Sequence, residues 1–396
     1  MDASHPLWVS DWKESKGEAT IQRHCTGIST SASSVPVPGH VEGEDKEVDV
    51  VLYCSWFCPF AQRAWIAVEE LGINYEYVEC NPYKVDPREP GGYTKQSLSL
   101  PDKQKLMPQF MKTSPRGLVP AITDVQHNKA DVWESSVVME YLDTTYGHST
   151  LYTKSPHIQA LLRIYVDHCT ARIQKSYYTF LMETNPQAQT TAKNEFFHEC
   201  RVLACAMAPT GTGTSASESS SNLSTPTPDK ILQETMRVLQ KDTGNKGMHI
   251  QRVDVQSLSQ ISQRAFQQET GKDNLIQPGP FFLGQHFSAV DVALAPFWQR
   301  ILWVGAHYRD LKLPSDAAFE RLDTWWQAVS QRPGVANTLV CKERLVSSYR
   351  QYAHNIATSD FAKGMQSSLR GESTTTTTTT TTTTRPRSNI PKEATH

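Results

Sequence analysis

Residues 48–63 read VDVVLYCSWFCPFAQR, and two patterns of hydrophobic residues meet within them at Cys58. The first pattern is a short apolar run rich in β-branched residues, which predicts a buried strand over 48–55. From Pro59 onward, apolar residues recur at helical spacing as far as Gly72, which predicts a helix over 59–71. Proline is favoured at the first position of a helix, so we expect Cys58 at the N-cap.

A thiol at this position faces free backbone N–H groups and the positive end of the helix dipole. We therefore expect the pKa of Cys58 to lie below the usual value of about 8.5, which favours the nucleophilic thiolate. A buried, unreactive cysteine is the alternative interpretation. Cys54 stands in a Cys-x-x-x-Cys spacing, unlike the Cys-x-x-Cys of dithiol oxidoreductases, and we favour a core thiol over a resolving partner for Cys58.

Strand and helix patterns alternate over residues 48–147 and predict an α/β domain with a mixed sheet, bounded at 46 and 148. A second strand predicted at 75–79 is followed there by a long polar connection that contains Lys84, Pro87 and Pro90. Helical periodicity alone over 155–355 predicts an all-α domain. Within it, Ser288 and Asp291 have the spacing of a capping box. Polar, low-complexity sequence predicts a loosely ordered extension over 1–45, a disordered insert over 209–228 and a disordered threonine-rich tail over 358–396.

The whole chain has 396 residues, a formal net charge of −2 and eight cysteines without regular spacing. Its charge argues against a role on nucleic acid or on a membrane surface, and no apolar stretch is long enough for a membrane span. The first residues lack the basic and apolar regions of a secretory signal. We therefore expect a cytoplasmic protein with reduced thiols and no metal, since no Cys/His spacing fits a zinc site.

The segment FCPFA at 57–61, placed after a strand, resembles the active-site opening of the omega class of glutathione transferases. Further pieces stand in the order of that family: SPRGLVP at 114–120, Glu134-Ser135, and the capping box at 288–291. The resemblance covers 48–152 well and 155–350 loosely. It implies a thioredoxin-like α/β domain before an all-α domain, glutathione as co-substrate, and a homodimer.

The resemblance also implies roles in binding glutathione. Ser135, at a helix start with free backbone N–H groups, is implied to hold the γ-glutamyl carboxylate. Glu134 is implied to pair with substrate charge or to orient that loop. Val119 precedes Pro120, the proline that has a cis peptide bond in the family, and its backbone is implied to pair with the cysteinyl part of the tripeptide.

Two further assignments concern the edges of the site. Lys84 is the nearest cation to the family's lysine for the glycyl carboxylate, although that lysine falls on Val85 when counted from Cys58. A second, electrophilic substrate is implied to bind between the domains, against a helix at 158–182 that carries Tyr165, Arg172 and Tyr178.

These features favour a glutathione-dependent thiol transferase or reductase that acts by thiol–disulfide exchange through Cys58, as in deglutathionylation or dehydroascorbate-type reduction. The substrate would be a small disulfide or electrophile. One alternative is glutathione conjugation to electrophiles or removal of glutathione from adducts. Relatives specialised for hydroquinone adducts usually have tryptophan where this chain has Phe60, which argues against that last activity. Another alternative is a non-catalytic binding or regulatory module with the same fold.

Overall fold

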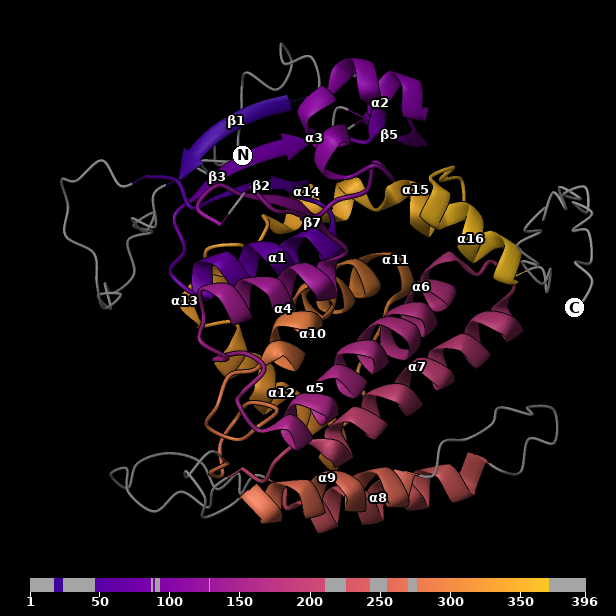
Figure 1. Cartoon of the computed structure of the whole chain (residues 1–396). Coiled ribbons are helices and arrows are strands. Elements are labelled where there is room, and N and C mark those ends of the chain that lie inside the picture. The colour runs from indigo at the N-terminus through magenta and orange to yellow at the C-terminus, as the bar shows by residue number, and fades with distance from the viewer. Residues whose placement is uncertain are drawn as a thin grey trace, which may run out of the picture.

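In the part of the chain that the structure describes, strands alternate with helices up to residue 133, and the segments beyond it form helices (Figure 1). The structure is a computed structural model that describes residues 18–23, 47–86, 88–89, 93–127, 129–210, 226–242, 255–269 and 276–369. The predicted fold class, a thioredoxin-like α/β domain followed by an all-α domain, is confirmed.

The elements have the following bounds. The strands are β1 Glu18–Arg23, β2 Val50–Cys54, β3 Tyr75–Cys80, β4 Tyr83–Val85, β5 Tyr93–Ser97, β6 Ala121–Asp124 and β7 Asp131–Trp133. The helices are α1 Pro59–Glu70, α2 Leu100–Leu106, α3 Pro108–Thr113, α4 Ser135–Thr145, α5 Pro156–His168, α6 Lys175–Met182, α7 Pro186–Ala206, α8 Pro228–Asp242, α9 Val255–Glu269, α10 Ala289–Arg300, α11 Ala306–Arg309, α12 Ala317–Val329, α13 Pro333–Ala336, α14 Lys342–Ser348, α15 Arg350–Ala353 and α16 Asp360–Leu369. Two π-helical segments, Cys169–Gln174 and Ile301–Gly305, continue α5 and α10.

The main sheet is mixed and has the strand order β1-β3-β2-β6-β7. β2 pairs in parallel with β3 and antiparallel with β6, while β1 and β7 are antiparallel edge strands. Side chains of β2 alternate between the two faces of the sheet, as the pleat requires. Leu52 and Cys54 join the core that contains α1 and α4, whereas Tyr53 packs against Phe110 of α3 on the opposite face. The sheet is therefore covered by helices on both sides.

The helical domain is organised around α10, all of whose residues are buried. The predicted capping box at its start is confirmed: the Asp291 carboxylate accepts hydrogen bonds from the backbone N–H of Ser288 at 2.7 Å and from its hydroxyl at 2.8 Å. The same carboxylate accepts the indole N–H of Trp325 at 2.7 Å. Asp291 thus joins α10 to α12. No helix in the described ranges is both long and apolar enough to cross a membrane.

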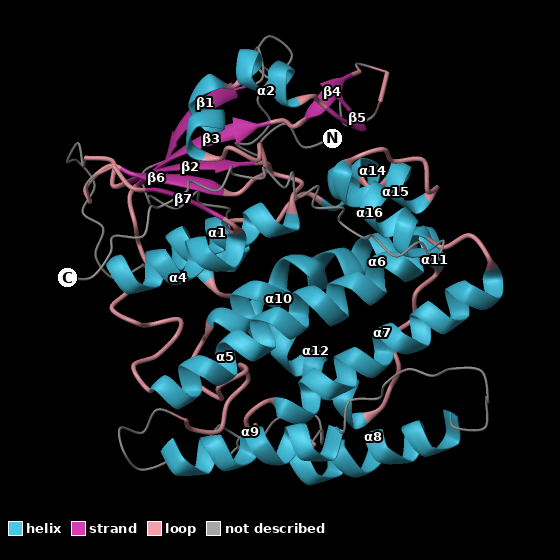
Figure 2. Cartoon of the chain, turned by 45° about the vertical axis from the view of Figure 1, so that its right-hand side comes forward, coloured by secondary structure: helices cyan, strands magenta, loops and turns pink. Residues whose placement is uncertain are grey.

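Three segments differ from the sequence-based predictions. The predicted polar connection after β3 contains the β4–β5 hairpin, and the predicted loose extension contains β1. The tail predicted to be disordered from 358 contains the helix α16, which packs against α6, so the prediction is wrong for residues 360–369 (Figure 2). Most of the predicted insert, at 211–225, lies outside the described residues, as do 370–396.

Candidate functional site

A pocket of about 350 Å³ opens where the start of α1 meets the β4–β5 hairpin, the loop before β6 and the C-terminal helices. The residues predicted for catalysis and for glutathione binding share this pocket, with the exception of Lys84. The lining residues are Phe57, Cys58, Pro59, Phe60, Pro82, Tyr83, Lys95, Gly117, Leu118, Val119, Pro120, Trp133, Glu134, Ser135, Tyr178, Tyr349, Tyr352, Asp360 and Phe361.

Cys58 occupies the N-cap of α1, and Pro59 follows at the first helical position, as predicted. The loop before the helix is fixed from several directions. The backbone N–H of Trp56 donates to the Glu79 carboxylate at 3.2 Å, and a guanidinium N–H of Arg300 donates to the carbonyl of Phe57 at 3.0 Å. The loop therefore presents the half-buried Cys58 to the pocket in a defined position.

Burial raises the pKa of the Cys58 thiol above its usual value. The backbone N–H groups of Ala61 and Phe60 act in the opposite direction, as do the charges of Arg300 and Lys95, but together they do not outweigh the loss of hydration. The predicted lowering of this pKa is therefore wrong. The thiol does lie at the helix N-terminus, as expected. The sequence around Cys58 could not predict that the hairpin and the C-terminal helices would reduce its contact with water.

Cys54 lies in the sheet core with no exposed surface and is a free thiol. Burial raises its pKa, and the nearby Glu79 carboxylate raises it further. These surroundings agree with the predicted core role and leave Cys54 poorly suited to act as a resolving thiol.

The loop at 114–120 is shaped by a few local contacts. Gly117 has φ +60, and an added Cβ would lie 2.8 Å from the side chain of Lys103, so glycine suits this position for two reasons. The Ser114 hydroxyl donates to the carbonyl of Leu118 at 2.8 Å. The peptide bond between Val119 and Pro120 is cis, as the resemblance implies. Because β6 begins only at Ala121, Val119 lies at the pocket wall, before the strand.

Glu134 and Ser135 lie at the start of α4. Glu134 is the N-cap with φ 71, an uncommon value for a residue other than glycine. Its carboxylate accepts a hydrogen bond from Arg116 at 2.8 Å in an ion pair whose two side chains are both exposed. Ser135 begins the helix and is 9% exposed. The Ser135 hydroxyl and the first backbone N–H groups of α4 therefore lie at the pocket wall.

The structure separates the two lysines of the β4–β5 hairpin. Lys84 is exposed and does not line the pocket, so its predicted role is not supported by its position. Lys95, on the partner strand, is 3% exposed and lines the pocket beside Cys58. Sequence reasoning missed Lys95 because the hairpin was interpreted as an irregular connection. The tyrosines at 83 and 93 were the available signal of paired strands.

The second wall of the pocket comes from the helical domain and is largely aromatic. Of the three residues predicted to face an electrophilic substrate, Tyr178 lines the pocket, whereas Tyr165 and Arg172 do not. The remaining aromatic residues of this wall, Tyr349, Tyr352 and Phe361, come from the last described segments. The Tyr178 hydroxyl bonds that of Tyr349 at 2.7 Å. No short motif predicts these positions, which depend on how the C-terminal segment folds back.

Residues 57–145 match the family model described as the glutathione S-transferase N-terminal domain. This part of the chain is therefore similar to the N-terminal domain of glutathione S-transferases. Its sequence is 26% identical over 155 residues to a probable glutathione S-transferase from Nicotiana tabacum, an alignment that covers 39% of this chain and 58% of the relative. It is also 26% identical over 170 residues to glutathione S-transferase omega-1 from Mus musculus, covering 42% and 58%. The chain thus spans 58% of the length of each of these relatives.

Solved structures of glutathione transferases are similar to this chain over most of its length. Glutathione transferase Omega 3C from Trametes versicolor is 25% identical, with a TM-score of 0.49, covering 79% of this chain and 94% of that one. A rice glutathione transferase in complex with glutathione is 18% identical, with a TM-score of 0.44, covering 82% and 99%.

Proposed function

We propose that this protein is an omega-like glutathione-dependent thiol transferase that acts by thiol–disulfide exchange through Cys58. The observation that carries the proposal is the thiol at the N-cap of α1 in a pocket it shares with Val119 and Ser135. Transferases that conjugate glutathione usually have serine or tyrosine at this position, to stabilise the glutathione thiolate. A cysteine there can instead form a disulfide itself.

In the proposed reaction, the Cys58 thiolate attacks the glutathione sulfur of a mixed disulfide. The sulfur–sulfur bond of the substrate breaks, the substrate thiolate leaves and takes up a proton, and Cys58 holds glutathione in a new disulfide. A second glutathione thiolate then attacks that disulfide. Oxidised glutathione leaves, and Cys58 returns to its starting state. Oxidised glutathione thus combines the glutathione taken from the substrate with the incoming one, and the incoming thiol is the reductant, so no second protein thiol is required.

The N-terminal domain supplies the proposed contacts with glutathione. The hydroxyl of Ser135 and the backbone N–H groups at the start of α4 are suited to the γ-glutamyl carboxylate. The backbone of Val119 is suited to the cysteinyl amide, and Glu134 to the glutamyl amine. The cytoplasmic location and the homodimer remain predictions.

One observation favours a second candidate, a non-catalytic binding module with the same fold. Burial raises the pKa of Cys58, and a less ionised thiol is a slower nucleophile at neutral pH. The position of the thiol at the pocket still favours the transferase, and the higher intrinsic nucleophilicity of a thiolate of high pKa offsets part of the loss in ionised thiol.

The test is reduction of a glutathionylated peptide by glutathione, catalysed by the full chain and by Cys58→Ala, with Cys54→Ala as the matched control. We expect the first variant to lose the catalysed rate and the second to keep it. Intact mass and peptide mapping after exposure to oxidised glutathione should show one adduct, on Cys58. Equal rates for Cys58→Ala and the parent would refute the proposal, and a Cys54–Cys58 disulfide would refute the one-thiol mechanism.

A further inference from the structure

Lys95 is a buried cation in the pocket to which the proposed reaction assigns no role. Its ammonium nitrogen lies 4.0 Å from the ring centre of Phe57, 4.8 Å from that of Tyr83 and 4.9 Å from that of Tyr93. A fourth ring, that of Tyr352, lies at 5.6 Å. Aromatic faces stabilise a cation that has lost part of its water, but they do not neutralise its charge.

No acidic side chain in the described residues forms an ion pair with Lys95, and no hydrogen bond of its ammonium group is found there. Two carboxylates lie in the pocket wall, yet both act elsewhere. Glu134 pairs with Arg116, and the exposed Asp360 at the rim influences the charge of Lys103. Burial lowers the pKa of Lys95 to about 7, although the charge of the Cys58 thiolate acts in the opposite direction. Charged side chains are rarely buried this deeply unless they are paired, so the missing partner of Lys95 needs an explanation.

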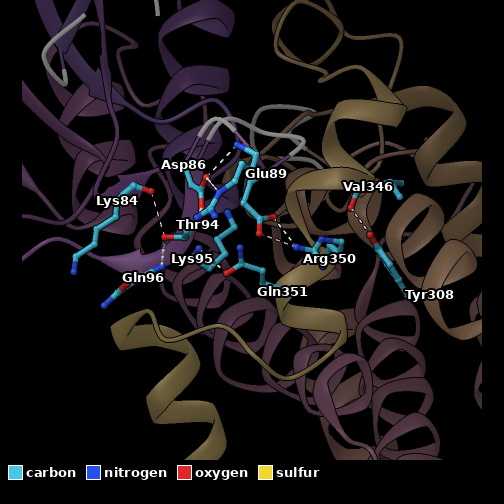
Figure 3. A network of polar contacts seen from close by, with 11 residues as sticks. Lys84, Asp86, Glu89, Thr94, Lys95, Gln96, Tyr308, Val346, Arg350 and Gln351 are labelled. Carbon is cyan, nitrogen blue, oxygen red and sulfur yellow. Dashed lines mark hydrogen bonds and ion pairs between the residues drawn. The ribbon is translucent and has the colours of Figure 1, made fainter. Parts of the chain in front are cut away.

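The backbone around Lys95 is held by the C-terminal segment, as Figure 3 shows for part of the network. Its N–H donates to the Gln351 side chain at 2.7 Å, and its carbonyl accepts from the N–H of Thr358 at 3.2 Å. On the same hairpin, Glu89 forms an ion pair with Arg350 at 2.7 Å. The lysine is thus fixed between the two domains, whereas Lys84 lies outside this arrangement.

From this placement we infer that Lys95 and the rings around it form a subsite for the anionic group of an aromatic substrate, whose disulfide or electrophilic centre then faces Cys58. The aromatic wall of Tyr178, Tyr352 and Phe361 offers faces on which a flat ring can stack. A carboxylate or sulfonate on that ring would supply the missing partner of the ammonium group, in a charge-assisted hydrogen bond. The inference rests on the proposed function, since it names the class of substrate that Cys58 attacks.

The carboxylate could instead belong to glutathione. The position of Lys95 favours the second substrate, because its rings are completed by Tyr352 from the helical domain and the pocket continues there along Tyr178 and Phe361. The proposed contacts of glutathione, at Val119 and Ser135, lie in the N-terminal domain. The experiment below separates the two sources.

The test compares two symmetric aromatic disulfides, anionic 5,5′-dithiobis(2-nitrobenzoate) and the smaller, neutral 2,2′-dithiodipyridine, in single-turnover reaction with Cys58 at neutral pH. In each case the Cys58 thiolate displaces one aromatic thiolate and keeps the other half as a mixed disulfide. The rate measured for Cys58→Ala is subtracted, which removes the contribution of the other cysteines. The rate with the anionic disulfide is divided by the rate with the neutral one. This ratio is then divided by the same ratio measured for glutathione free in solution.

We expect the normalised ratio to favour the anionic disulfide and to fall at least tenfold in Lys95→Met, equivalent to about 1.4 kcal/mol. Lys84→Met, on the same hairpin, should leave it unchanged. If Lys95 acted only on the thiolate, both rates would fall by the same factor and the ratio would stay constant, which would overturn the inference. An unchanged ratio accompanied by weaker glutathione binding would assign the carboxylate to glutathione and would also overturn it.

A second measurement does not depend on the reactivity of Cys58. In Cys58→Ser protein with Lys95 intact, 2-naphthoate should bind at least tenfold more tightly than neutral 2-naphthamide by calorimetry, and equal affinities would overturn the subsite. Failure of Cys58 to react with either disulfide, together with a preference for naphthoate, would refute the proposed function but support the subsite. Circular dichroism of Lys95→Met establishes whether that variant folds.

Discussion

Glu79→Gln tests the buried carboxyl directly behind the loop that carries Cys58. Glu79 is 3% exposed, accepts the hydroxyl of Tyr77 at 2.6 Å and the backbone N–H of Trp56 at 3.2 Å, and lies in the charge field of Arg344. Burial raises its pKa from 4.5 to about 7 in spite of these favourable contacts. Glutamine has the same shape and can keep both hydrogen bonds through its carbonyl oxygen.

The magnitude follows from the linkage between protonation and folding. Because the folded pKa is above the unfolded value, the contribution of Glu79 to stability is fully present below pH 4.5 and is lost as the pH rises through 7. Between about pH 5.5 and pH 8, this group should lower the free energy of unfolding by about 2 kcal/mol. The glutamine variant has no such group, so its stability should fall about 2 kcal/mol less than that of the parent over this interval.

Urea unfolding followed by tryptophan fluorescence at the two pH values measures the difference. Comparing each protein with itself across pH removes the constant effect of the substitution. Glu76→Gln, on the same strand but half-buried, is the matched control and should behave like the parent. If parent and Glu79→Gln lose the same stability between the two pH values, the carboxyl does not titrate in that range and the reasoning is refuted.

Three further predictions concern the pocket and its supports. Alkylation of Cys58 by iodoacetamide should keep accelerating as the pH rises past the range in which a free cysteine titrates, since burial raises the pKa of the thiol; a plateau below pH 7 would contradict this. Arg300→Met should lower the free energy of unfolding in urea by about 3 kcal/mol. The buried carbonyl of Phe57, the side-chain carbonyl of Gln62 and the hydroxyl of Tyr349 would each lose their donor. A change below about 1 kcal/mol would argue against this. Ser135→Ala should weaken retention on immobilised glutathione about tenfold, whereas Lys84→Ala should not, and equal losses would place the glycyl carboxylate at Lys84 after all.

The part of the site that depends on short stretches of chain could be predicted from sequence. The apolar run and proline around Cys58 placed the thiol at the N-cap, and the capping box of Ser288 and Asp291 stands at the start of α10. The cis bond at Pro120 was implied by a motif whose backbone conformation is set within a few residues. In each case the neighbours in sequence are also the neighbours in space.

The part that depends on distant segments could not be predicted. Cys58 is partly covered by a hairpin and by helices that come from residues far along the chain, and the resulting loss of hydration reverses the expected direction of its pKa shift. Lys95 has its position because Gln351 and Thr358 bind its backbone, although nothing near it in sequence indicates the contact. The polar composition after 358 suggested disorder, but the ten-residue helix α16 packs against α6.

The bridge between Gln96 and Thr358, with Phe361 just beyond it, also bears on how the protein is made. Cys58 and Phe361 are separated by 303 positions in the chain, the difference between 361 and 58. At about 5–20 residues per second, a ribosome takes about 15–60 s to cover that distance. Throughout that time the nascent thiol has no C-terminal wall, so cellular disulfides can reach it before the pocket can discriminate among them. Cys58 should therefore be most open to unselective oxidation during its own translation.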